Sequence, residues 1–440
     1  MHNLSFALSV AIALAGALFL IIYLPRVIAW FGAVKPQKRI VNPGKSRFAL
    51  LVPARNESRA IGDLFASLSR QDYDKGMYDI HVIINDPSDP TAEMCRTAGA
   101  RVHVVRNQSC KGDALNGAVR TLLSEKEKYD AYIIIDADCA LADDFLSRMN
   151  DAMASGCDVI CAKKLVKNRL YGKNAGLVRG KGQNRKVSMW SDCNGVIWTL
   201  IDDMGNRFKS DKGITCMTVG TGLALRGSLM EKLGGWPYRK TLTEDIELMY
   251  DCASSGYTTY YSSYAKVYVE ESPLHSVTNK RRCRWMSGVV ASRRLYKQSL
   301  ADNGSLKDRY YTTVLGCAYL YIGFCFAAGI FSIAAAAVSA AVSPDWYYML
   351  IPCALGFGSV YLSFFLMTLT ALFIERENMR GYGTLRLIQI ALIHPLFYAE
   401  YIFIVGRAIF GKNEFRWEAI ERVGASENGA EENDEQVKCS

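Results

Sequence analysis

The chain has 440 residues, of which 50% are hydrophobic and 22% are charged. This composition excludes an intrinsically disordered chain, and the length is sufficient for two or three domains. Lys and Arg number 52 against 43 for Asp and Glu, which gives a net charge of +9. Strongly apolar blocks flank a middle part of ordinary polarity, so a purely water-soluble protein is not expected.

The first apolar block, residues 4–24, contains no charged side chain. As a helix it would be about 30 Å long, which matches the hydrocarbon thickness of a bilayer. No Lys or Arg precedes the block and no convincing cleavage site follows it, so a retained transmembrane anchor (residues 1–32) is favoured over a signal peptide. Basic residues in the following linker (residues 33–46) place the end of this helix in the cytoplasm by the positive-inside rule.

The middle of the chain, residues 47–276, has the pattern of an α/β domain. Short apolar strands alternate with segments of helical periodicity, and the predicted strands are 48–52, 81–84, 101–105 and 131–135. This alternation predicts a mostly parallel sheet with helices on both faces. In such a sheet, ligands bind beyond the carboxyl ends of the strands.

A second apolar region, residues 311–410, is predicted to be transmembrane, and a tail of residues 411–440 follows it. It contains three apolar blocks, and the third begins at residue 387. Three crossings would leave the tail outside, whereas the basic residues around Arg407 and Lys412 favour the inside. Because His394-Pro395 lies early in the third block, a broken or interfacial helix is the alternative to a full crossing.

Two carboxylates, Asp136 and Asp138, come directly after the strand predicted at 131–135. In an extended chain, side chains two residues apart point the same way. The pair could therefore hold Mg²⁺ or Mn²⁺ against the phosphates of a nucleotide diphosphate. Taken alone, the same pattern is a turn or a helix cap about half the time.

Further polar groups follow the other strands or open helices. Pro53, Asn56 and Glu57 end the first strand, and Asp86 follows the second. Glu244-Asp245 opens a predicted helix, where the preceding Thr243 could simply be an N-cap. Arg281, Arg284 and Trp285 lie in a predicted interfacial amphipathic segment (residues 277–310), where the less specific interpretation is a basic membrane anchor.

In this order, the motifs resemble the membrane-bound family 2 of nucleotide-sugar glycosyltransferases, which includes cellulose, hyaluronan and poly-N-acetylglucosamine synthases. The resemblance covers about residues 48–285 and includes Lys111-Gly112 before Ala114-Leu115-Asn116. It implies a GT-A-like nucleotide-sugar binding domain flanked by transmembrane helices. The chain departs from the family pattern at Asp86-Pro87-Ser88-Asp89, which is shorter and lacks the usual glycine, and at Arg281, where many members have glutamine.

The resemblance also implies roles for individual residues. Asp245 is implied to be the general base and Asp138 the ligand of a divalent cation, Mg²⁺ or Mn²⁺. A single base without a protein nucleophile implies direct displacement with inversion. The implied donor-binding residues are Pro53, Asn56, Glu57, Asp86, Lys111, Asp136, Arg281 and Arg284. The implied acceptor-binding residues are Gly220, Thr221, Glu244 and Trp285, whose ring offers an apolar face to a sugar.

The expected function is transfer of a sugar from a UDP-sugar to a growing polysaccharide by a multi-pass enzyme of the cell membrane. Single-step transfer to a lipid, which makes a glycolipid, is the alternative. Only one helix precedes the α/β domain, and three or four helices are few for a polymer channel. A second copy of the chain or an accessory membrane subunit is therefore a candidate partner.

A basic stretch, residues 160–191, contains no acidic residue. The alternatives for it are a nucleic-acid site, a surface for anionic lipid headgroups, a site for a phosphorylated lipid acceptor and a solvated face. Attachment to a membrane favours lipid over nucleic acid, and no nucleic-acid partner is expected. Its basic residues are Lys163, Lys164, Lys167, Arg169, Lys173, Arg179, Lys181, Arg185 and Lys186.

Overall fold

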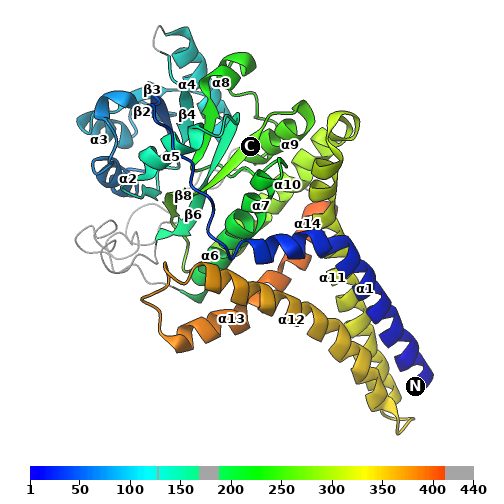
Figure 1. Cartoon of the computed structure of the whole chain (residues 1–440). Helices are drawn as coiled ribbons and strands as arrows, with labels where there is room; N and C mark the ends of the chain where they lie inside the picture. Colours follow the sequence, from blue (N-terminus) through cyan, green and yellow to red (C-terminus); the bar gives the residue numbers. More distant parts are fainter. Residues whose placement is uncertain (126–127, 168–187, 412–440) are drawn as a thin grey trace, which may run out of the picture.

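The structure is a computed structural model that describes residues 1–125, 128–167 and 188–411. It contains an α/β unit between residues 48 and 269 and a set of apolar helices formed by the two ends of the chain (Figure 1). The strands of the unit are β1 (Phe48–Pro53), β2 (Tyr78–Ile84), β3 (Arg101–Val104), β4 (Ala131–Ile134), β5 (Ala140–Leu141), β6 (Val159–Val166), β7 (Leu223–Arg226) and β8 (Thr259–Val269). Its helices are α2 (Ile61–Leu68), α3 (Thr91–Thr97), α4 (Lys111–Ser124), α5 (Phe145–Met153), α6 (Met189–Ile201), α7 (Arg207–Asp211), α8 (Gly227–Leu233) and α9 (Glu244–Ser255). Shorter helical turns are Lys75–Met77, Trp346–Met349 and the π-helical Asp202–Asn206.

The eight strands form one sheet in the order β3-β2-β1-β4-β7-β6-β8-β5. The predicted parallel arrangement is found in β3-β2-β1-β4, where all three pairings are parallel. The sheet as a whole is mixed, because β7 is antiparallel to both of its neighbours and β5 is antiparallel to β8. The GT-A-like fold class expected from the sequence is thereby confirmed as a mixed sheet covered by helices.

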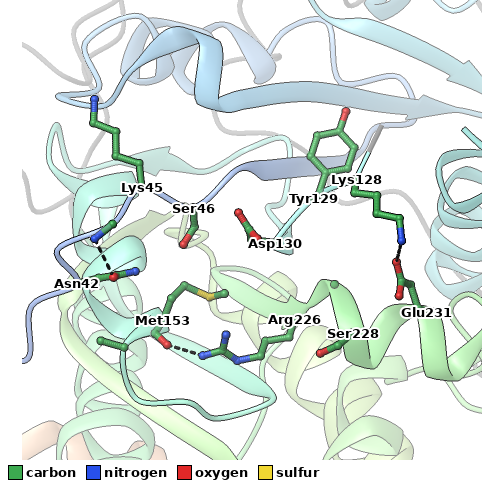
Figure 2. Close-up of a pocket in the computed structure, with 13 residues that line it drawn as sticks. Asn42, Lys45, Ser46, Lys128, Tyr129, Asp130, Met153, Arg226, Ser228 and Glu231 are labelled. Atoms are coloured by element: carbon green, nitrogen blue, oxygen red, sulfur yellow. Dashed lines mark hydrogen bonds and ion pairs between the residues drawn. The ribbon is translucent and has the colours of Figure 1, made fainter. Parts of the chain in front are cut away.

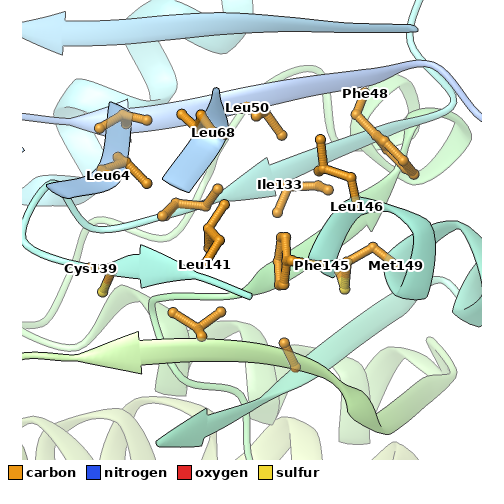
Figure 3. Packing of buried hydrophobic residues seen from close by; sticks show 14 of the residues in the cluster. Phe48, Leu50, Leu64, Leu68, Ile133, Cys139, Leu141, Phe145, Leu146 and Met149 are labelled. Carbon is orange, nitrogen blue, oxygen red and sulfur yellow. The ribbon is translucent and has the colours of Figure 1, made fainter. Parts of the chain in front are cut away.

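Both faces of the sheet are buried, as expected for strands that are continuously apolar. Alternate residues of β1 face opposite sides: Phe48 and Leu50 belong to one apolar cluster, and Ala49 and Leu51 to another. Helices α2 and α5 cover the first face, where Figure 3 shows their side chains packed over β1 and β4. Helices α4, α8 and α9 cover the second face.

Four helical segments are long and apolar enough to cross a membrane, judged by length and composition in the described parts of the chain. They are α1 (His2–Gly32), α11 (Leu306–Ser339), α12 (Leu350–Ile374) with its preceding turn, and α13 (Thr384–Ala399) with α14 (Tyr401–Phe410). Figure 1 shows α1, α11 and α12 extending away from the α/β unit, whereas α13 and α14 lie near it. The break in the last segment lies at Glu400, and Pro395 lies inside α13.

The segment predicted to be interfacial forms part of α10 (His275–Asn303). Its Cys283 and Met286 pack with Phe397 and Tyr401 of α13 and α14, so one side of α10 is covered by the apolar helices. Another part of α10 packs on α9, where Gly288 lies so close to Thr243 that an added Cβ would be 2.3 Å from its hydroxyl oxygen. Helix α10 therefore joins the α/β unit to the last apolar segment.

Two of the alternatives for the basic stretch, the lipid-binding surface and the solvated face, are wrong for its first three lysines, because their ammonium groups are buried in ion pairs. Lys163 contacts carboxylates of Asp203 at 2.7 Å and Glu375 at 2.6 Å. Lys164 contacts Asp202 at 3.0 Å, and Lys167 contacts Asp63 at 2.6 Å. These acidic partners come from distant parts of the sequence, which is why the stretch looks uncompensated when read alone. The other basic residues of the stretch, from Arg169 to Lys186, lie outside the described residues.

The buried pair Lys164–Asp202 leads to a test of stability. Replacing Lys164 by Gln leaves the wholly buried carboxylate of Asp202 without its cation, so the free energy of unfolding should fall by about 3–5 kcal/mol. The loss should be the same in detergent and in anionic bilayers, because lipid takes no part in the pair. Thermal unfolding of Lys164→Gln and of the exposed control Lys212→Gln measures this. Equal stability of Lys164→Gln and the parent protein would contradict the assignment.

Candidate active site

The sequence-predicted residues gather where β4 ends and β7 begins. Asp136 follows β4, while Gly220 and Thr221 precede β7. Because β4 and β7 are antiparallel, with Ile134 opposite Leu223, the end of one strand lies beside the start of the other. The hydroxyl of Thr221 accepts a hydrogen bond from the backbone N–H of Asp136 at 3.1 Å, which joins the two connections.

Lys111, the first residue of α4, lies at the centre of this group. Its ammonium donates to a carboxylate oxygen of Asp136 at 2.5 Å and to the carbonyl of Gly220 at 2.7 Å, and it lies 3.6 Å from Glu244. Burial alone would lower the pKa of Lys111, but the carboxylates of Asp136, Glu244 and Asp245 raise it above its ordinary value. Lys111 therefore remains charged and neutralises part of a dense acidic cluster.

Asp245 lies in the first turn of α9, where acidic side chains interact favourably with the positive end of the helix. One of its carboxylate oxygens accepts the backbone N–H of Gly220 at 2.7 Å, and the other accepts the N–H of Ile246 at 2.9 Å. Burial, followed by the charge of Glu244, raises the pKa of Asp245 to about 7, while Lys111 opposes the shift. A carboxyl group with this pKa and a fixed orientation can accept a proton near neutral pH.

Three side chains next to Lys111 form a group that could hold a metal ion. Ligand atoms of Asp136, Asp138 and Cys139 lie within 4.8 Å of one another. The two carboxylates fit a hard cation such as Mg²⁺ or Mn²⁺, which prefers oxygen ligands. Burial raises the pKa of the Cys139 thiol well above its ordinary value, so the thiol stays protonated and donates to Asp138 at 3.7 Å.

A second set of predicted residues follows β1 and β2, which are parallel neighbours in the sheet. Here Asp89 accepts the backbone N–H of Asn56 at 2.7 Å, and Asn56 has a left-handed backbone with a φ of 57°. Asp86 accepts both the N–H and the hydroxyl of Ser88, at 2.9 and 2.7 Å. The shortened Asp86–Asp89 turn is thus closed by its own side chains without the glycine of the family pattern. Pro53 ends β1, and the N–H of Glu57 donates to Thr91 at 3.1 Å.

The arginine-tryptophan motif lies on α10. The guanidinium of Arg281 pairs with the buried Glu271 and lies 4.9 Å from the ring centroid of Trp285. Glu271 also accepts the indole N–H of Trp198 at 2.8 Å, and the rings of Trp198 and Trp285 are 5.5 Å apart in an edge-to-face arrangement. Trp285 and Arg284 are partly buried.

The structure brings Lys111, Gly220, Glu244 and Asp245 together beside Asp136. It also pairs Arg281 within the protein, a contact that its motif does not predict. Two supporting residues were missed: Asp89, which orients Asn56, and Lys167, whose ammonium donates to the carbonyl of Asp138 at 2.9 Å. Asp89 could have been identified from the sequence, because it is the second acidic residue of the turn after β2. No local signal distinguishes Lys167 from a surface lysine.

A pocket of about 570 Å³ lies at the other edge of the sheet, before the strands begin (Figure 2). Its lining includes Ser46 and Asp130, which precede β1 and β4, and Arg226 at the end of β7. None of the predicted site residues lines this pocket. The chemistry-bearing side chains therefore belong to the opposite edge, where the parallel strands end.

Known proteins that are similar to this chain include glycosyltransferases. A curated relative, the probable glycosyltransferase YdaM of Bacillus subtilis (strain 168), is 24% identical over 255 residues, which are 55% of this chain and 55% of that protein. The chain thus matches little more than half the length of this relative. Among solved structures, the mannosyltransferase PcManGT from Pyrobaculum calidifontis, in complex with GDP-Man and Mn²⁺, has a TM-score of 0.53 at 18% identity, covering 84% of this chain and 99% of that one. Staphylococcus aureus TarS has a TM-score of 0.40 at 16% identity, covering 76% and 54% of the two chains.

The family model described as glycosyltransferase-like family 2 matches residues 43–288. This range contains the whole α/β unit, the acidic cluster around Lys111 and the arginine-tryptophan motif. The chain therefore belongs to the glycosyltransferase-like family 2.

Proposed function

We propose that the protein is an inverting, metal-dependent glycosyltransferase that moves a sugar from a UDP-sugar to a growing polysaccharide at the cell membrane. The observation that carries the proposal is the position of Asp245, which two backbone N–H groups orient beside Lys111 and the Asp136 region. An acceptor hydroxyl must lose a proton as it attacks the sugar, and Asp245 has a suitable pKa for accepting it. One base without a protein nucleophile corresponds to a single displacement, which inverts the anomeric carbon.

Departure of the nucleoside diphosphate leaves negative charge on its phosphates. A divalent cation on Asp138 would stabilise that charge as a Lewis acid. Lys111 and Arg284 are the residues of this chain proposed to add positive charge there, and Lys111 already lies beside Asp136. That the fold neighbour PcManGT was solved with GDP-Man and Mn²⁺ supports including a metal in the proposal.

The acceptor is proposed to reach the site along α10. Trp285 offers a partly exposed ring to a sugar, and α10 packs against the start of α9, which carries Asp245. A sugar held there after one transfer would be the acceptor for the next, which favours chain extension over a single addition. Basic residues after α1 support a cytoplasmic location for the α/β unit of a multi-pass membrane enzyme.

The role of Asp245 predicts a dependence on pH. Because the carboxylate must be unprotonated to act as a base, kcat/KM should fall about tenfold per pH unit below about 7. Asp245→Asn should keep donor binding but lower the rate by a factor on the order of 10² to 10⁴. UDP release measured across pH for both proteins tests this, and near-parental transfer by Asp245→Asn would refute the assignment.

The close packing at Gly220 predicts sensitivity to a single methyl group. A Cβ at this position would lie 3.0 Å from the ammonium of Lys111 and 3.3 Å from a carboxylate oxygen of Asp245. Gly220→Ala should therefore displace both groups and reduce kcat about tenfold or more, with little change in the unfolding temperature. The control is Gly62→Ala, because nothing lies within 4 Å of its added Cβ. Full activity of Gly220→Ala would show that this contact is not required.

Metal dependence is tested by removing the cation or its proposed ligand. A chelator should abolish UDP release, and added Mn²⁺ or Mg²⁺ should restore it. Asp138→Ala should lose both activity and Mn²⁺ binding, and electron paramagnetic resonance measures that binding. The exposed Asp143, which pairs with Arg70, provides the control variant Asp143→Ala. Activity that a chelator leaves unchanged would contradict the role of Asp138.

Product length separates the polysaccharide proposal from its glycolipid alternative. With saturating UDP-sugar and a lipid acceptor supplied, mass spectrometry should show products that carry many added sugars. Trp285→Ala should shorten these products while leaving donor binding intact, because the ring is proposed to contact only the acceptor. Parent products that carry one sugar would overturn chain extension and favour glycolipid synthesis.

A further inference from the structure

The last apolar segment is interrupted at one residue, Glu400, which separates α13 from α14. Glu400 is the single acidic residue between positions 384 and 410. A carboxylate in an apolar segment is costly unless a partner compensates its charge. The residues that pair with Glu400 therefore indicate the role of this break.

Two residues of α10 bind this carboxylate. The guanidinium of Arg282 pairs with Glu400, and an imidazole nitrogen of His275 lies 2.9 and 3.0 Å from its two oxygens. Arg282 also donates to the carbonyl of Phe397 at 3.0 Å, in the last turn of α13, and lies 3.9 Å from the ring centroid of Phe397. A cation at the end of a helix satisfies carbonyls that lack a partner within the helix.

Both ends of the broken segment are held on the side of the α/β unit. Near its start, Arg386 contacts the buried Asp192 of α6 at 2.8 and 3.0 Å. Near its end, the carbonyl of Ile409 accepts from Arg294 of α10 at 3.1 Å. Figure 1 shows α13 and α14 close to the unit. The segment is interrupted at Glu400, whose backbone stays helical with φ −57° and ψ −23°, so the break is a bend between the two helices.

We infer that Arg282 and Glu400 form a clamp that holds the bend between α13 and α14 on α10 and thereby positions Trp285 for the acceptor step. The inference rests on the proposed function. Arg282 precedes Trp285 by three residues on the same helix, so a shift of α10 at the clamp is passed directly to the ring. Arg282 contacts neither donor nor acceptor in this account and is a positioning residue.

Burial of the two partners is unequal, which makes the clamp testable. The side chain of Arg282 is 0% exposed, whereas that of Glu400 is 33% exposed. Glu400→Gln leaves a buried guanidinium without its counter-charge, while Arg282→Met leaves a carboxylate that retains water and His275. Glu400→Gln should therefore lower the unfolding temperature more than Arg282→Met, and the double variant should recover most of that loss.

The loss of kcat in the two single variants and the double variant should not parallel their loss of unfolding temperature. In all three variants the clamp is absent, so kcat for transfer to the acceptor should fall about tenfold or more. The KM for UDP-sugar and the thermal shift that UDP-sugar produces should change less than kcat does, because Arg284 is on α10 whereas donor residues such as Lys111 and Asp136 lie outside it. Arg293→Met, which removes an exposed arginine of the same helix, is the matched control and should keep parental values.

The decisive comparison is the double variant Arg282→Met/Glu400→Gln. Near-parental stability with impaired transfer supports positioning, whereas recovery of transfer together with stability would reduce the pair to a purely structural contact. Equal unfolding temperatures for the two single variants would also overturn the clamp. A parent protein that binds UDP-sugar but transfers nothing would instead refute the proposed function.

Discussion

Repulsion among carboxylates is the constraint on which this site depends. Asp136 follows β4, whereas Glu244 and Asp245 begin α9, and they can share one edge of the sheet because the ammonium of Lys111 lies among them. Lys111 does not cancel the effect of burial, since the pKa of Asp245 remains raised to about 7. One cation thus keeps the cluster together and leaves a carboxyl group suited to proton transfer near neutral pH.

The topology of the sheet places these groups within reach of one another. The antiparallel strand β7 brings Gly220 to the end of β4, where its N–H binds Asp245 and its carbonyl binds Lys111. A fully parallel sheet would put the start of the neighbouring strand at the opposite edge. The mixed order therefore matters for the chemistry, since it supplies backbone donors and acceptors between the acidic side chains.

Sequence reasoning succeeded where the signal is local. Strands such as β1 and β4 are continuous apolar runs, so the periodicity of apolar residues along the chain predicted the fold class. The carboxylates Asp136 and Asp138 follow directly after β4, and the order of the motifs indicated most of the acidic cluster. It failed for Lys163 and Lys164, whose charges are compensated by distant residues that no local pattern reveals. A broken helix in the third apolar block was the alternative drawn from His394-Pro395, but the break lies at Glu400, whose partner Arg282 is 118 residues earlier in the chain.

The central claim is a single displacement at the anomeric carbon with Asp245 as base, and the stereochemistry of the product tests it most directly. Nuclear magnetic resonance of the product made from an α-linked UDP-sugar gives the configuration of the new bond. The account predicts a β-linkage, because one displacement without a protein nucleophile inverts the carbon. An α-linked product would show retention and would contradict the mechanism derived from this site.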